Sequence, residues 1–298
     1  MTEKQRNRNS KRKGLTLVLL YFFLPLFAQE FRSEKASIDL GRGKKPIGFA
    51  TAGDMAPNLE AMVNESVYYG LVIGVDNYMD PAIQSLDHAV ADAQKVFDML
   101  STKYTFEKGN IRFLKDPKRD DIIYALDYLS NVVTPNDNLV IFYAGHGHWD
   151  ANASIGFWLP SDARKISSTD WFRNSTLVDY LKAINSRHTL LITDACFGGS
   201  IFKTRTAFDD APQDIKVLYE YPSRTAMTSG AMTEVPDESS FTKYLLERLE
   251  KNREKYLSAE QLFSSMRTAV INNSEAIPQY GEIRNVGDQG GDFVFIKK

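Results

Sequence analysis

The stretch NLVIFYAGHGHWD, residues 138–150, begins as an apolar strand and ends in two histidines. Residues 139–143 are all large and apolar or aromatic, which is typical of a strand that is buried on both faces of a sheet. The chain has only four histidines, and two of them, His146 and His148, lie here with one glycine between them. The stretch therefore predicts a central strand that ends at a metal site, a catalytic base or an ordinary strand end.

Similar apolar segments of two kinds alternate along the rest of the chain. Short runs rich in β-branched and apolar residues predict strands at 68–75, 111–116, 138–145, 188–199 (running into a turn) and 291–298. Apolar residues at helical spacing predict helices at 85–100, 120–133, 175–185, 240–252 and 258–270. This alternation is typical of an α/β fold with a mostly parallel sheet, in which reactive groups lie just past the carboxyl ends of the strands.

Composition describes an ordinary globular protein. The 298 residues are 43% hydrophobic and 25% charged, enough for one large domain or two modest ones. The formal net charge of −2 leaves no excess of lysine and arginine to neutralise phosphates, so we expect no nucleic-acid partner.

The N-terminus has the order of an export signal. Residues 1–14 carry six Lys or Arg against one Glu, an apolar run follows over 15–27, and Ala28 offers a small residue for cleavage. The apolar run is shorter than the roughly 20 residues that a membrane-spanning helix needs. We expect a signal peptide over 1–28 and a periplasmic or secreted protein without a membrane span, the alternative being an uncleaved anchor.

Residues 29–65 show no sustained periodicity and are interpreted as a linker or pro-segment before a domain at 66–298. The only cysteine of the chain, Cys196, lies in that domain, so no intramolecular disulfide can form. A lone cysteine is either a small buried hydrophobe or a reactive thiol.

Cys196 follows the predicted strand of residues 188–194 in the run DACFGG, and His146 follows another strand 50 residues earlier. A reactive thiol needs a base, and histidine titrates near neutrality. If the two strands are neighbours, both side chains meet at one sheet edge. The backbone N–H groups of Gly147 and Cys196 can then form an oxyanion hole, because glycines leave the approach of a carbonyl open.

FYAGHG at 142–147 followed by DACFGG at 194–199 resembles the caspase-like cysteine peptidases, and most of all their bacterial metacaspase-like members. The resemblance runs from about Tyr68 to the C-terminus. It implies a three-layer sandwich whose mostly parallel central sheet has about six strands with helices on both faces. It also implies a dyad of His146 as general base and acid and Cys196 as nucleophile.

The family resemblance extends to substrate binding. Caspases carry glutamine two residues before the cysteine, whereas this chain has Asp194, as in metacaspases. A second pocket acid of metacaspases corresponds to Asp92, for which a solvated helix position is the alternative. Two carboxylates favour a basic side chain, so we predict peptide or protein substrates that are cleaved after Arg or Lys.

Further expectations come from the same family. Lys203 and Arg205 lie where relatives have a flexible loop, and we predict self-cleavage there. No cofactor is required. Metacaspases are often activated by calcium, but the acidic residues form no EF-hand loop that would locate an ion. Metacaspases tend to be monomeric, so we expect a monomer.

Two rival functions stay open at this stage. A catalytically silent caspase-like module would bind or scaffold partners, although this chain keeps both members of the dyad. A metal-dependent hydrolase would use His146, His148 and Asp150, which match the first half of a zinc-ligand pattern. Ala151 stands where that pattern needs another histidine.

Overall fold

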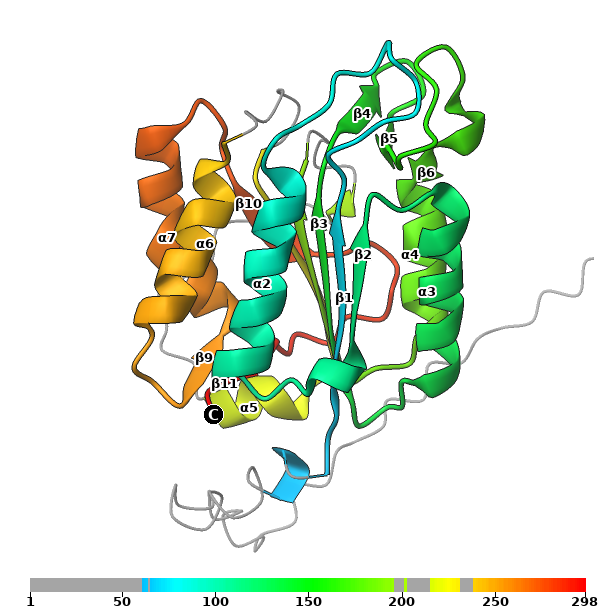
Figure 1. Ribbon diagram of the computed structural model, residues 1–298. Helices are drawn as coiled ribbons and strands as arrows, with labels where there is room; N and C mark the ends of the chain where they lie inside the picture. The colour runs from blue at the N-terminus through cyan, green and yellow to red at the C-terminus, as the bar shows by residue number, and fades with distance from the viewer. Residues whose placement is uncertain (1–60, 64, 196–200, 203–214, 231–237) are drawn as a thin grey trace, which may run out of the picture. The chain divides into compact units, whose positions relative to one another are not determined.

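The computed structural model describes residues 61–63, 65–195, 201–202, 215–230 and 238–298 (Figure 1). The predicted signal peptide, Cys196, Lys203 and Arg205 lie outside these described residues.

The central element is a six-stranded sheet in the order β10-β8-β7-β3-β1-β2. Its strands are β1 (Tyr68–Gly74), β2 (Ile111–Lys115), β3 (Asn138–Ala144), β7 (His188–Asp194), β8 (Ser223–Thr228) and β10 (Gln279–Glu282). All neighbouring pairs are parallel except β8 and β10, which are antiparallel. The mostly parallel six-stranded sheet is therefore confirmed.

Helices cover both faces of the sheet (Figure 1). On one face lie α2 (Ala89–Lys103), α6 (Ser240–Lys251) and α7 (Ala259–Asn273), and on the other lie α3 (Arg119–Val132) and α4 (Asn174–Ala183). The short α5 (Ile215–Glu220) precedes β8, and 3-10 turns span Lys108–Asn110 and Ser168–Asp170.

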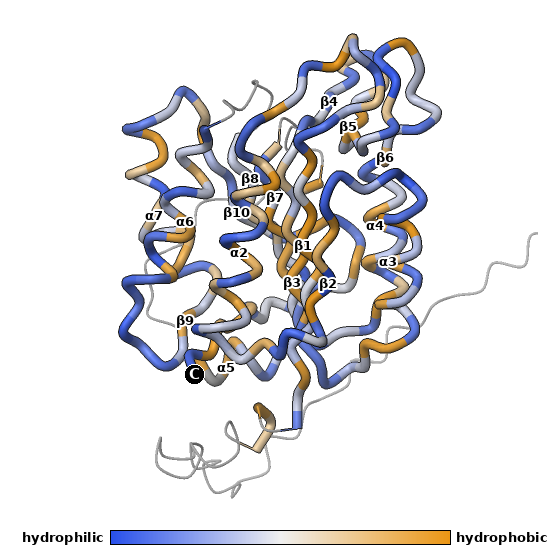
Figure 2. The backbone as a smooth tube through the Cα atoms, in the orientation of Figure 1, coloured by the Kyte–Doolittle hydropathy of each residue, from blue (hydrophilic) through white to orange (hydrophobic). Residues whose placement is uncertain are grey.

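Side chains of each strand alternate between two hydrophobic cores, as the two-residue period of a strand requires. In β3, Val140 and Phe142 join the core shared with α2, α6 and α7. Leu139, Ile141 and Tyr143 join the core shared with α3 and α4. Figure 2 shows the apolar residues concentrated in these central strands. Burial on both faces explains why β3 has no polar alternation in its sequence.

Several strands escape the sequence pattern. β8 (SRTAMT) and β10 (QYGE) are short and mostly polar, so nothing in their composition indicates strands of the central sheet. The predicted closing strand exists as β11 (Val294–Ile296), but it pairs with β9 (Tyr256–Ser258) in a separate two-stranded sheet. A three-stranded antiparallel sheet, β4 (Gly147–Asp150), β5 (Ile155–Trp158) and β6 (Phe172–Arg173), was not expected at all.

The end of the predicted linker is attached to the domain, since Met62 and Val63 pack against the core on the α2 side. Among the helices in the part of the chain that the structure describes, none is both long and apolar enough to cross a membrane.

His188 provides a test of the core. Its Nε2 donates to the carbonyl of Tyr219 at 3.0 Å, and its Nδ1 lies 2.9 Å from the Ser223 hydroxyl. Burial lowers the pKa of His188 from 6.5 to about 3, so the native ring stays neutral while the unfolded ring takes up a proton.

The neutral His188 ring therefore makes its full contribution to the free energy of unfolding above about pH 6.5. As the pH falls toward the folded pKa, this free energy decreases by about 1.4 kcal/mol per pH unit. We expect His188→Gln to flatten the fall of the unfolding free energy between pH 6 and 4, measured by urea denaturation. His148→Gln, at an exposed site, is the control and should keep the wild-type slope. Equal slopes in all three proteins would contradict this account.

Candidate functional site

Two strand ends meet at the carboxyl edge of the central sheet. β3 and β7 are parallel neighbours, and their last residues, Ala144 and Asp194, are register partners. The N–H of Gly145 contacts the carbonyl oxygen of Asp194 at 3.4 Å, so the adjacency continues past the strands. His146 and Cys196 each come two residues after one of these paired residues. Cys196 itself lies outside the described residues.

Gly145 makes the turn that leaves β3. Its φ is +155°, which L side chains rarely adopt, and an added Cβ would lie 2.9 Å from the Tyr143 hydroxyl and 3.2 Å from the Val75 Cβ. A side chain here would push the following histidine out of place. The first glycine of AGHG is therefore required by geometry.

The His146 ring is held in one orientation by a backbone carbonyl. Nε2 lies 2.8 Å from the carbonyl oxygen of Gln84. A carbonyl only accepts hydrogen bonds, so Nε2 carries the proton in the neutral ring and Nδ1 keeps a lone pair. The basic atom of the half-buried imidazole is therefore Nδ1.

Two tyrosines fix the backbone of His146. Its N–H donates to the hydroxyl oxygen of Tyr78 at 2.9 Å, and its carbonyl accepts from the hydroxyl of Tyr143 at 2.7 Å. The Tyr78 ring also packs on the His146 ring, with centroids 5.2 Å apart. Burial raises the pKa of Tyr78 well above its ordinary value, so its hydroxyl stays neutral and remains a stable acceptor.

Hydrogen bonds fix the loop that carries Tyr78 and Gln84 at two points. Asp116 accepts the N–H groups of Asp76 and Asn77 at 2.7 and 3.0 Å. Further along, Asp80 accepts the N–H of Lys165 at 2.8 Å, which joins this loop to the segment after β5.

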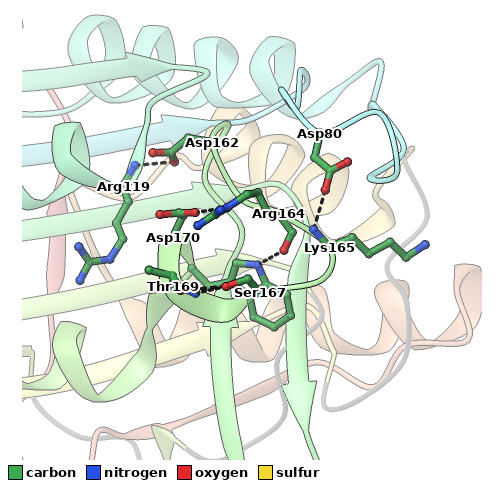
Figure 3. A network of polar contacts seen from close by, with 9 residues as sticks. Asp80, Arg119, Asp162, Arg164, Lys165, Ser167, Thr169 and Asp170 are labelled. Atoms are coloured by element: carbon green, nitrogen blue, oxygen red, sulfur yellow. Dashed lines mark hydrogen bonds and ion pairs between the residues drawn. The ribbon is translucent and has the colours of Figure 1, made fainter.

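Figure 3 shows that segment closed on itself by an Arg164–Asp170 ion pair of 2.6 Å. Ile83, from the first loop, packs against Leu159 and Ala163 of the same segment. The carbonyl that orients His146 is thus part of a braced structure.

The amide of Gly147 points to the outer edge of β4. The N–H of Leu159 donates to the carbonyl of His146 at 3.0 Å, so these two residues form a hydrogen-bonded pair. The next pair along the ladder is Gly147 with Trp158. Hydrogen-bonded and non-bonded pairs alternate along an antiparallel ladder, so the N–H of Gly147 faces away from β5. β4 is the edge strand of its sheet, so this N–H faces the sheet's outer side.

Asp194 is a buried acid at the end of β7. Burial raises the pKa of its carboxyl, the nearby Asp92 adds to the rise, and the hydroxyls of Ser229, Ser239 and Thr242 act in the opposite direction. Oδ2 accepts from the Thr242 hydroxyl at 2.5 Å.

Oδ1 of Asp194, by contrast, is buried and has no hydrogen-bond partner among the described residues. A buried acceptor without a donor is costly, and a cationic ligand is one way to satisfy it.

Asp92 lies in the first turn of α2, close enough to Asp194 to influence it electrostatically. Its side chain is only 14% exposed and forms an ion pair of 2.8 Å with Lys95. Asp92 is thus a largely buried residue whose carboxylate contacts Lys95 and whose charge acts on Asp194, and its role in a pocket stays a prediction.

The residues of the predicted zinc-ligand pattern make other contacts. His148 packs against Trp171 with ring centroids 4.7 Å apart, and Asp150 accepts turn amides from Asn152 and Ala153. In the described part of the chain no three His, Cys, Asp or Glu side chains gather into a metal site. Within the described ranges, His146, His148 and Asp150 do not gather as the zinc pattern requires, and calcium activation stays a prediction.

Some contributors to the site had no signal in the sequence. The carbonyl of Gln84 acts through the backbone, which any residue provides. Tyr78 lies in a loop whose path only the fold determines. The hydroxyls around Asp194 come from Ser229 just after β8 and from Ser239 and Thr242 at the start of α6, and β8 itself was not predicted.

A family model and curated relatives both indicate the same protein family. The model of the caspase domain matches residues 69–286. Metacaspase-1 of Saccharomyces cerevisiae, strains YJM789 and S288c, is 33% identical over 85 residues. That stretch is 26% of this chain and 19% of the relative, so the chain spans about a fifth of the curated relatives it matches.

Among solved structures, caspase-1 from Spodoptera frugiperda aligns with a TM-score of 0.54 at 12% identity, covering 74% of this chain and 90% of that one. Protein GSU0716 from Geobacter sulfurreducens aligns with a TM-score of 0.48 at 15% identity, covering 75% and 97%. The alignment with caspase-1 agrees with the fold described above.

Tyr78→Phe tests the support of His146. The change removes the acceptor of the His146 N–H and leaves a partly buried donor unpaired, which costs about 1–3 kcal/mol. We expect a loss of that size in the unfolding free energy from urea titrations. Tyr124→Phe is the matched control, because Tyr124 is 69% exposed, and it should change stability by less than about 0.5 kcal/mol. Equal urea midpoints for Tyr78→Phe and Tyr124→Phe would show that the Tyr78 hydroxyl does not stabilise the backbone of His146.

Proposed function

This chain belongs to the caspase-domain family, and we propose that it is a cysteine endopeptidase that cleaves peptide bonds through His146 and Cys196. The observation that carries the proposal is the register of β3 and β7. Because Ala144 and Asp194 are partners, a base and a thiol follow neighbouring strand ends at equal distance along the chain. Reactive groups of parallel sheets lie at this edge.

The proposed chemistry begins with a proton transfer. Nδ1 of His146 takes the proton of the Cys196 thiol, and the thiolate attacks the carbonyl carbon of the substrate. The imidazolium then gives its proton to the leaving amine, and the acyl-enzyme thioester remains. A water molecule deprotonated by Nδ1 hydrolyses the thioester and restores the thiol. The Gln84 carbonyl supports both steps, since it accepts from Nε2 and stabilises the charged ring.

The tetrahedral intermediate carries a negative oxygen that needs donors. We assign this role to the backbone N–H groups of Gly147 and Cys196. The outward direction of the Gly147 amide supports the assignment, because a substrate oxygen at the outer edge of β4 would lie on its axis. Donors fixed by the backbone need no reorganisation during the reaction.

Specificity for a basic residue follows from the two acids. A guanidinium would supply donors to the unpaired Oδ1 of Asp194 and would relieve its repulsion with Asp92. The proposed substrates are therefore peptides or proteins with Arg or Lys before the cleaved bond. The same preference makes Lys203 and Arg205 the proposed self-cleavage positions.

Reporter peptides test the peptidase directly. The wild-type chain should release the leaving group from an Arg-terminated reporter and leave an Asp-terminated one intact. Cys196→Ala and His146→Ala should each lower kcat/KM by at least about 10³-fold, since they remove the nucleophile or its base. Mass spectrometry should find cleavage after Lys203 or Arg205 in the wild type and not in Cys196→Ala.

The rival functions give other results in the same assay. Turnover by neither wild type nor variant would indicate the silent binding module. Chelator-sensitive turnover that survives Cys196→Ala would indicate a metal hydrolase.

Asp194→Asn tests the basic pocket. The change keeps the size of the side chain and removes its charge, so kcat/KM for an Arg peptide should fall about 10- to 100-fold. The pKa of Asp194 is raised, and only its ionised form attracts a cation, so the wild-type kcat/KM should rise with pH through that raised pKa.

A citrulline peptide, which has the shape of Arg without its charge, is the matched control. The ratio of the Arg to the citrulline rate should rise with pH in the wild type and stay flat in Asp194→Asn. A flat ratio in both proteins would remove Asp194 from the pocket.

A further inference from the structure

A cavity of about 280 Å³ lies between α4 and the β4–β5 hairpin. Its wall is completed by Ile201 and by the residues that follow β10. It is lined by Ser154, Ile155, Gly156, Asn174, Val178 and Lys182, together with Ile201 and Arg284. This volume lies at the lower end of the range for ligand pockets and is large enough for one large side chain.

The cavity lies on the opposite side of the reacting edge from the two acids. Asp92 is on α2, and Asp194 accepts a hydrogen bond from Thr242 of α6. Both helices lie on the same face of the central sheet. The cavity borders α4, which covers the other face (Figure 1). A peptide whose basic residue meets the acids and that crosses this edge would therefore run toward the α4 side on one side of the cleaved bond.

The register of the three-stranded sheet gives the distance between the Gly147 amide and the cavity wall. Gly147 is the partner of Trp158, and Gly156 on the cavity wall is two residues further along β5. Two residues of strand span roughly 7 Å, and neighbouring strands are about 5 Å apart. The wall thus begins within roughly 10 Å of the Gly147 amide, which an extended peptide covers in about two or three residues.

The wall also includes the chain just past the nucleophile. The carbonyl of Ile201 accepts the N–H of Arg284 at 2.9 Å, and Phe202 forms an antiparallel bridge with Ile283. The Arg284 side chain donates through Nε to the carbonyl of Phe202. These contacts join the cavity wall to residues 201–202, which follow Cys196 by five and six positions in the sequence.

Charge selects the side chain that fits. Two cations, Lys182 and Arg284, line the cavity with one acid, Asp179. Asp179 pairs with Lys182 at 3.2 Å, and Arg284 binds a backbone carbonyl that carries no full charge. Among the described residues no acid pairs with Arg284, so one positive charge of this lining is uncompensated, beside the apolar surfaces of Ile155, Val178 and Ile201. An aliphatic stem that ends in a carboxylate matches both features.

We propose that this cavity is a specificity subsite for an acidic side chain, Glu above all, at the second or third residue after the cleaved bond. The inference rests on the proposed peptidase function and deepens it. The substrate would then carry a basic residue before the bond and an acidic one after it.

The test uses two kinds of substrate. Quenched peptides carry Arg before the bond and either Glu or Lys at the second or third residue after it. A coumarin amide of the same Arg sequence has no residue beyond the bond and reports on the dyad and the basic pocket alone. The wild-type chain should cleave the Glu peptide about three- to tenfold faster than the Lys peptide, and high salt should reduce the difference.

Lys182→Glu should abolish or invert the preference and leave the coumarin rate unchanged. Lys103→Glu is the matched control, because the two side chains are similarly exposed, 46% and 47%, and each pairs with an acid. It should keep the wild-type preference. Val178→Trp, which fills the cavity, should slow the extended peptides and spare the coumarin amide.

Equal rates for the Glu and Lys peptides, with the coumarin amide still cleaved, overturn the subsite and leave the peptidase standing. Absence of cleavage of every substrate overturns the proposed function, and the subsite with it.

Discussion

The pairing of β3 with β7 is the constraint on which the rest of the site depends. A shift of register by one residue would turn the side chains of β7 to the opposite face and would separate the two strand ends. The register is fixed because both strands are buried on both faces, with alternate residues in two different cores. The same packing that stabilises the domain therefore sets the spacing of the proposed base and nucleophile.

Asp194 shows how the site differs from a stable core. A buried carboxyl with one oxygen that has no partner among the described residues lowers stability, and an apolar residue at the end of β7 would pack at less cost. The hydroxyls of Ser229, Ser239 and Thr242 compensate part of the penalty. His188, at the opposite end of the same strand, is also buried, yet both of its nitrogens have partners. This contrast supports a binding role for Asp194 and a packing role for His188.

The sequence predicted the elements that have strong patterns. β3 and α2 follow from an unbroken apolar run and from helical spacing, and the two strand-end motifs led to His146 and to Asp194 on the described chain. β8 and β10 were missed because hydroxyl and polar residues can be buried in a sheet once neighbouring groups satisfy them. Gln84 and Tyr78 were missed because a backbone carbonyl and a loop path have no pattern of their own. Export, the monomeric state and calcium dependence stay predictions.

Covalent labelling of the thiol tests the proposed dyad and basic pocket together. A peptide that ends in an Arg acyloxymethyl ketone reacts with an activated cysteine, and intact mass followed by peptide mapping identifies the residue and the stoichiometry. We predict one adduct per chain, on Cys196, that is lost in His146→Ala and is not formed by the corresponding Asp reagent. Equal labelling of the wild type and His146→Ala, or equal labelling by both reagents, would contradict the dyad or the basic pocket.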